Sequence, residues 1–83
     1  MNPKKWAELL RYSSPYSILV IKGRNKIIEL QCPFEVELRH DIGVLIKGTV
    51  QSVEMVKLST TMLTVFIIKG DAYYYYHFNI LMK

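Results

Sequence analysis

The sequence predicts a mainly β protein: a short N-terminal helix, then five or six antiparallel strands in a strongly bent sheet or small barrel. Beyond Pro15, short apolar runs are separated by glycine, proline, asparagine and serine, which are typical turn residues. Several of these runs alternate apolar and polar residues with the period of a half-buried strand. The chain has 83 residues, of which 51% are hydrophobic and 22% charged, which is typical of a folded chain. We therefore expect residues 1–83 to form one small domain.

The first dozen residues predict a helix over about residues 3–12. An asparagine followed by a proline suits a helix N-terminus. The asparagine side chain caps the helix, and proline fits the first helical position because an amide hydrogen there would have no partner within the helix. Trp6, Leu9 and Leu10 recur at helical spacing and would form one apolar stripe. Pro15 ends the helix, since proline keeps the residue before it out of the helical region.

The remaining chain predicts strands joined by short turns. The expected strands cover about residues 16–22, 26–32, 34–39, 44–57, 62–69 and 72–81. Pro33 separates the second strand from the third, because proline has no amide hydrogen to donate to a ladder. In the fourth strand the apolar residues change phase between Val50 and Val53, which predicts a bulge or bend. We expect that change at Gly48 and Ser52, where the bend lets the sheet curl over and close on itself.

This order of elements, with a bent middle strand, resembles the layout of SH3-like, Sm-like and OB-like small barrels. The resemblance is architectural and rests on no family motif. Small barrels of this kind commonly bind RNA or single-stranded DNA, which is one of the two functions considered below.

Residues with catalytic or metal-binding potential are few and scattered. The chain has two histidines, His40 and His77, and one cysteine, Cys32. No serine lies in a G-x-S-x-G elbow, no glycine-rich phosphate loop is present, and the ligand types show no metal-site spacing. Cys32 falls on the apolar face of its expected strand, where thiols are generally inert. We therefore expect no enzyme, no metal, no cofactor and no small-molecule substrate.

The cysteine content and the N-terminal sequence bear on location. A single cysteine allows no intrachain disulfide, which favours a reducing, cytoplasmic compartment. Charged residues such as Lys5 and Glu8 interrupt the first apolar residues, so we expect no signal peptide. The apolar run Met62–Ile68 is far shorter than the roughly 20 residues of a membrane span. We therefore expect a cytoplasmic protein without a membrane span.

The strongest candidate for a binding surface is the aromatic strand at about residues 72–81. Its more apolar, even-numbered residues are expected to face the core, so that Tyr73, Tyr75 and His77 line the outer face. A row of exposed tyrosines suits protein contacts and also the stacking of nucleic-acid bases. The alternative is that these rings pack beneath the N-terminal helix, with Trp6 lying over them.

A second candidate is the basic hairpin at Lys22, Arg24 and Lys26, whose charges suit contacts with phosphate groups. The alternative is that this hairpin is a hydrated turn without a binding role. The net charge of +4 gives a mild basic character only.

Two functional hypotheses follow. The first is a non-enzymatic interaction module, or a small subunit of a larger assembly, that binds a protein partner or itself through the aromatic strand. Strands that are apolar on both faces favour it, because one small barrel cannot bury so much apolar surface. The second is RNA or single-stranded DNA binding, in which the tyrosines stack on bases and the basic hairpin contacts phosphates.

Overall fold

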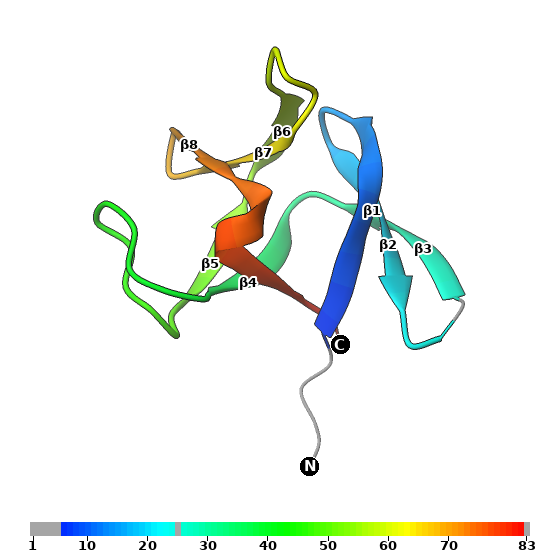
Figure 1. Ribbon diagram of the computed structural model, residues 1–83, viewed down its shortest axis with the longest axis horizontal. Coiled ribbons are helices and arrows are strands. Elements are labelled where there is room, and N and C mark those ends of the chain that lie inside the picture. Colours follow the sequence, from blue (N-terminus) through cyan, green and yellow to red (C-terminus); the bar gives the residue numbers. More distant parts are fainter. Residues whose placement is uncertain (1–5, 25, 83) are drawn as a thin grey trace.

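The structure, a computed structural model, describes residues 6–24 and 26–82 of the chain (Figure 1). For Trp6 it describes the backbone only. Antiparallel strands make up most of the described residues, and their one helical element is a short 3-10 turn. The predicted mainly β class is confirmed.

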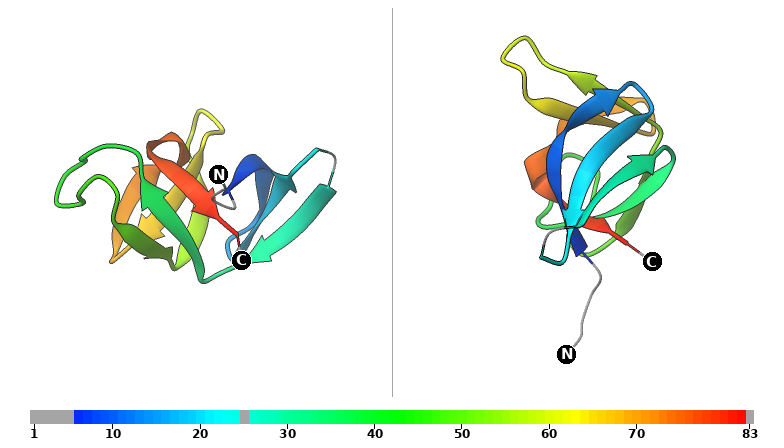
Figure 2. Two further views of the ribbon diagram at one scale, coloured as in Figure 1. Left: turned by 90° about the horizontal axis from the view of Figure 1, so that it is seen from below. Right: turned by 90° about the vertical axis from the view of Figure 1, so that its right-hand side faces the viewer.

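The described elements follow one another along the chain in this order: β1 (Trp6–Ser14), β2 (Ser17–Lys22), β3 (Lys26–Gln31), β4 (Phe34–Leu38), β5 (Val50–Val53), β6 (Met55–Leu58), β7 (Thr64–Ile68), β8 (Asp71–Tyr74), η1 (Tyr75–His77) and β9 (Phe78–Leu81). They form a six-stranded sheet in the order β3-β2-β1-β9-β4-β5 and a three-stranded sheet in the order β6-β7-β8 (Figures 1 and 2). These strands form no closed barrel, so the closed form of the predicted architecture is not adopted.

The predicted helix over residues 3–12 is wrong for the described residues 6–12, which belong to β1. Residues 2–5 lie outside the described residues. Leu9 pairs with Val20 and Arg11 with Leu19, so the residue between them is a β-bulge. The bulge adds one residue to the strand, and Leu9 and Tyr12 both pack against the core although they are three positions apart. A bulged strand thus reproduces the apolar spacing of a helix.

The bend predicted within the fourth strand lies at Glu54, between β5 and β6, and not at Gly48 or Ser52. Val53 and Val56 are both fully buried. A straight strand cannot bury residues three apart on one face, so the chain turns a corner between them. The Glu54 amide donates to the Ile67 carbonyl oxygen at 2.9 Å, which ties this corner to the second sheet.

Residues 44–49, which were also predicted as strand, form a loop instead. An isolated bridge joins Ile42 to Leu45, and Gly48 adopts a positive φ of 85° in the turn that leads back to β5. Leu45 is buried while Val44 and Ile46 are exposed, so this segment contributes one side chain to the core. The remaining predicted strands before residue 70 match β2, β3, β4 and β7 to within two residues.

The single strand predicted at 72–81 is interrupted by η1, so that β8 and β9 belong to different sheets. The even-numbered Phe78 and Ile80 are buried, as their phase predicts. Before the turn the phase is reversed, and Tyr73 packs against the core while Tyr74 is exposed. The 3-10 turn resets the alternation of side chains, because its period is three and not two.

One cluster of buried side chains is shared by the two sheets. The rings of Phe34 and Phe66 meet edge to face at 5.3 Å, and Phe78 lies 5.9 Å from Phe66. Ile18 and Val20 of β2 belong to the same cluster, so the N-terminal strands are packed onto the core. This core fixes the positions of η1 and of the loop between β4 and β5.

Candidate interaction surface

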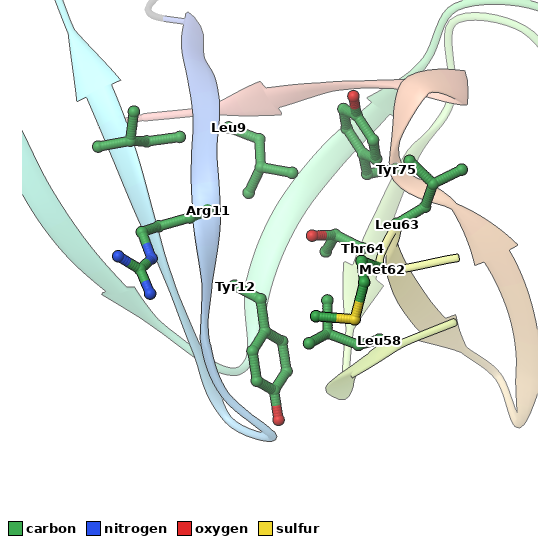
Figure 3. A pocket seen from close by; sticks show the side chains of 9 residues that line it. Leu9, Arg11, Tyr12, Leu58, Met62, Leu63, Thr64 and Tyr75 are labelled. Atoms are coloured by element: carbon green, nitrogen blue, oxygen red, sulfur yellow. The ribbon is translucent and has the colours of Figure 1, made fainter. Parts of the chain in front are cut away.

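Tyr73 and Tyr75 do not have the predicted outward orientation. Both are half-buried and pack against the core. The Tyr73 ring meets Phe78 edge to face at 6.1 Å, and the Tyr75 ring points into a groove opposite Leu9 (Figure 3). The alternative prediction, that these two rings pack inward, therefore describes them better. Their neighbours are strand β1 and the loop between β4 and β5, however, and not a helix. Whether Trp6 covers them lies outside the described side chains.

The exposed tyrosines of this segment are the even-numbered ones. Tyr74 is 39% exposed and Tyr76 is 45% exposed, and their rings stack nearly parallel, at 14° and 5.5 Å between centroids. The Tyr76 ring lies 4.7 Å from that of His77, which in turn lies 5.1 Å from that of His40. We call this row of four rings, Tyr74, Tyr76, His77 and His40, the aromatic ridge.

A hydrogen bond joins the two histidines at one end of the aromatic ridge. His40 Nε2 lies 2.8 Å from His77 Nδ1, although the residues are 37 positions apart in the sequence. Burial and the positive charge of His40 lower the pKa of His77 below its ordinary value of 6.5. At neutral pH the His77 ring is therefore uncharged. The sequence predicts His77 at the surface but not its partner, because nothing in the spacing signals a contact between η1 and the loop that carries His40.

A groove of about 500 Å³ runs beside the aromatic ridge, with Glu8 and Leu9 of β1 on one side and Tyr75 and Tyr76 on the other. Arg39 also lines this groove, and its Nη1 donates to the Tyr76 carbonyl oxygen at 3.4 Å. The surface therefore combines aromatic rings with one positive and one negative side chain at the groove wall.

The loop between β4 and β5 carries His40 and is held by contacts of its own. The Asp41 carboxylate accepts a hydrogen bond from the Lys47 amide at 2.7 Å, and Ile42 and Leu45 exchange two backbone hydrogen bonds. The turn at Gly43 lies next to the Tyr73 ring. Because the chain is fixed in this way, the loop presents its exposed side chains, Val44 at 80% and Ile46 at 60%, in a defined place.

The basic hairpin joins β2 to β3 and lies apart from the aromatic ridge (Figures 1 and 2). Lys22 and Lys26 are direct cross-strand partners, and Arg24 is exposed in the turn. Like charges placed opposite each other repel, so an anion at this position would be stabilising. The nucleic-acid hypothesis requires these cations to lie beside the exposed tyrosines, and the fold does not bring them together.

A second groove, of about 340 Å³, separates β1 from the turn between β6 and β7 (Figure 3). Its walls are mostly apolar: Leu9 and Tyr12 face Leu58, Leu63 and Met62, the last of which is 71% exposed. Beyond Ala7, β1 is paired only with β2, so this groove follows a strand edge.

Other titratable groups form no cluster of chemical interest in the described part of the chain. Burial raises the pKa of the Cys32 thiol, which keeps it protonated at neutral pH. Within residues 6–24 and 26–82, no three histidine, cysteine, aspartate or glutamate side chains converge as metal ligands would. The same residues include no helix with the length and apolarity to cross a bilayer.

Comparison with known proteins adds no relative. No family model, no curated protein and no solved structure matches this chain significantly.

Proposed function

We propose that this protein is a non-enzymatic interaction module that binds a protein partner through the aromatic ridge. The observation that carries the proposal is the row of four contacting rings, two of them tyrosines exposed at 39% and 45%, beside a groove. Tyrosine is enriched at protein interfaces, because it gives a large contact area and loses little conformational entropy on binding.

The geometry of the ridge favours a short, extended segment as the part of the partner that is bound. Stacking holds the rings of Tyr74 and Tyr76 in place, so little further order is needed when a ligand docks. The groove alongside receives side chains, and Arg39 and Glu8 offer charges that fix the direction of the segment. Aromatic-lined grooves of this type accept extended, proline-containing peptides in several small domains.

The strand order supports an SH3-like reading of residues 34–82. Strand β4 lies between β9 and β5, the chain bends at Glu54 into β6-β7-β8, and a 3-10 turn precedes the last strand. We infer an SH3-like unit that is left open and extended at its β9 edge by β1, β2 and β3. Because one fold hosts many functions, this supports the class of small binding module and nothing narrower.

Nucleic-acid binding is the second candidate. The opposed Lys22 and Lys26 favour an anion at the basic hairpin. Among the described residues that line the groove beside the aromatic ridge, Arg39 is the one cation. A protein that binds single-stranded nucleic acid needs a positively charged groove that follows the phosphates next to the rings on which the bases stack. The separation of the two features therefore favours a protein partner.

Display of random short peptides tests the proposal directly. Peptides are selected on the full chain, with counter-selection on the Tyr74→Ala/Tyr76→Ala variant, and their affinity is measured by fluorescence anisotropy. We expect the ridge variant to lose about 30-fold or more in affinity, the size of an interface hot spot. Tyr16→Ala is the matched control, because Tyr16 is an exposed tyrosine (59%) that lies outside the ridge.

Two other measurements complete this test. A short oligo-uridine is titrated at several salt concentrations; binding that needs Tyr74 and Tyr76 and falls with a log–log salt slope of roughly −3 to −4 would replace the proposal with nucleic-acid binding. Light scattering at rising concentration detects self-association. A dimer that is lost in the ridge variant but kept in Tyr16→Ala would identify the partner as a second copy of the chain.

A further inference from the structure

We propose that the His40–His77 hydrogen bond is an acid-sensitive latch, which keeps His40 in the aromatic ridge at neutral pH and releases it in acid. The latch itself is a property of the loop and η1. Its role in regulating partner binding rests on the proposed function of the ridge.

The hydrogen bond between the two rings limits the charge that the pair can hold. His40 Nε2 and His77 Nδ1 are 2.8 Å apart, and one of them must donate a hydrogen while the other offers a lone pair. With no charge or one positive charge on the pair, such an arrangement exists. With two charges all four ring nitrogens carry hydrogens, so two N–H groups would point at each other and two cations would lie side by side.

The groups around the pair add to this repulsion on one side and reduce it on the other. On the loop, Arg39 places a permanent positive charge next to His40, and Lys47 lies on the return arm. Asp41 is the nearest acidic residue in the sequence, and its carboxylate accepts the Lys47 amide. From β4, Glu37 precedes the loop. Strand β8 contributes one charged side chain, Asp71 at its first position, and His77 is the titratable base of η1.

The local environment already resists protonation of one member. Burial and the charge of His40 both lower the pKa of His77, which is the direction that a latch of this kind requires. Histidine is the side chain whose ordinary pKa lies closest to neutral pH, and the lowered pKa of His77 means that its proton enters at a more acidic pH than 6.5.

Release of the latch moves a small part of the loop. The Leu45 side chain is buried, and the Ile42–Leu45 backbone bonds do not depend on histidine protonation. At the base, the Arg39 amide donates to the His77 carbonyl oxygen at 3.0 Å. The Asp41 carboxylate still accepts from the Lys47 amide at 2.7 Å. The freed residue is therefore His40, between two fixed points. Its movement removes the fourth ring of the ridge and leaves Tyr74 and Tyr76 stacked.

An NMR titration of the full chain tests the latch without any partner. The protein has two histidines only, so both ring signals are assigned by one substitution. We expect two coupled steps, the lower of them below the ordinary histidine pKa of 6.5, with the amide signals of His40 and Asp41 shifting at that lower step. In His40→Gln, which keeps a polar side chain, His77 should titrate in one step closer to 6.5, and the loop amides should no longer respond.

Two results would overturn the proposal: independent titration of both rings near 6.5 with no shift of the loop amides, or a loop response that persists in His40→Gln. His77→Gln serves as a second variant if His40→Gln alters the fold.

The regulatory role is tested separately with a peptide selected on the ridge. Its affinity for the wild-type protein should fall about fivefold or more between about pH 7.5 and pH 5.5, and the fall should vanish in His40→Gln. Equal affinity at both pH values would show that the latch does not regulate binding. If no selected peptide depends on Tyr74 and Tyr76, the proposed function fails, and the NMR titration still decides the latch.

Discussion

Strand β1 and the β8–η1–β9 segment both break the two-residue period of a β-strand, but with opposite results. In β1 a bulge adds one residue, and the side chains of Leu9 and Tyr12 are both brought to the core. In the C-terminal segment a three-residue turn intervenes, and it exposes Tyr74 and Tyr76 while Tyr73 is drawn inward. A bulge restores burial within one sheet, whereas a turn between sheets reassigns which side chains meet solvent.

The largest loss of stability is expected from a substitution where the C-terminal segment enters the core. Phe78 is 5% exposed, directly follows η1, and contacts both Phe66 and Tyr73. Phe78→Ala should lower the free energy of unfolding by about 3–5 kcal/mol, because it removes a large buried ring and leaves a cavity. Urea unfolding followed by circular dichroism measures it. A loss below about 1 kcal/mol would mean that η1 and β9 are not anchored as described.

Deletion of the bulge residue Leu10 tests the other half of the comparison. Without the extra residue the strand alternates regularly as far as its second register shift, between Tyr12 and Ser14. The side chains on one side of the deletion then turn from the core to solvent. We expect a loss of more than about 2 kcal/mol in unfolding free energy, from the burial of Tyr12 or Leu9. The control is Leu10→Ala, which keeps the bulge and should change stability by only about 0.5 kcal/mol, since Leu10 is exposed.

A pair of neighbouring tyrosines sharpens the comparison further. Tyr73→Ala removes a half-buried ring that packs on Phe78 and the loop, and should cost about 1–3 kcal/mol of stability. Tyr74→Ala removes an exposed ring and should change stability by less than about 1 kcal/mol while weakening peptide binding. Thermal unfolding and anisotropy are measured on both variants. If Tyr74→Ala were the more destabilising of the two, the inverted phase of β8 would be wrong.

The smallest effect is the pH dependence of stability that His77 introduces. Its pKa is lowered in the folded protein, so the unfolded chain binds more protons between the folded value and 6.5. Stability should therefore be highest above pH 6.5 and fall as the pH is lowered through 6.5 towards the folded value, below which this contribution is constant. His77→Gln should flatten this part of the curve of urea midpoint against pH. An unchanged curve would contradict the assignment to His77.

Much of the fold follows from local signals in the sequence. Glycines near the strand ends, the break at Pro33 and the alternation of Phe34, Val36 and Leu38 predict β2, β3 and β4 to within two residues. The candidate site follows less directly. The concentration of tyrosines identifies its segment, but of the six predicted site residues only His77 belongs to the aromatic ridge. The other five lie inward or in the basic hairpin: Tyr73, Tyr75, Lys22, Arg24 and Lys26.

The errors have one physical origin. The spacing of Leu9 and Tyr12 fits a helix and a bulged strand equally well, and only pairing with β2 selects the strand. Similarly, continuous alternation through Tyr74 and Tyr76 gives no sign of η1, because the turn arises where β8 leaves one sheet and β9 joins another.

By itself, the sequence determined that the chain forms antiparallel strands and where most turns fall, because alternation, glycine and proline act within a few residues. Tertiary structure decided the phase of each interrupted strand, the exposure of Tyr74 and Tyr76, and the meeting of His40 with His77. These depend on which strands pair across the sheets, and that choice is made by burying the shared core rather than by any local preference.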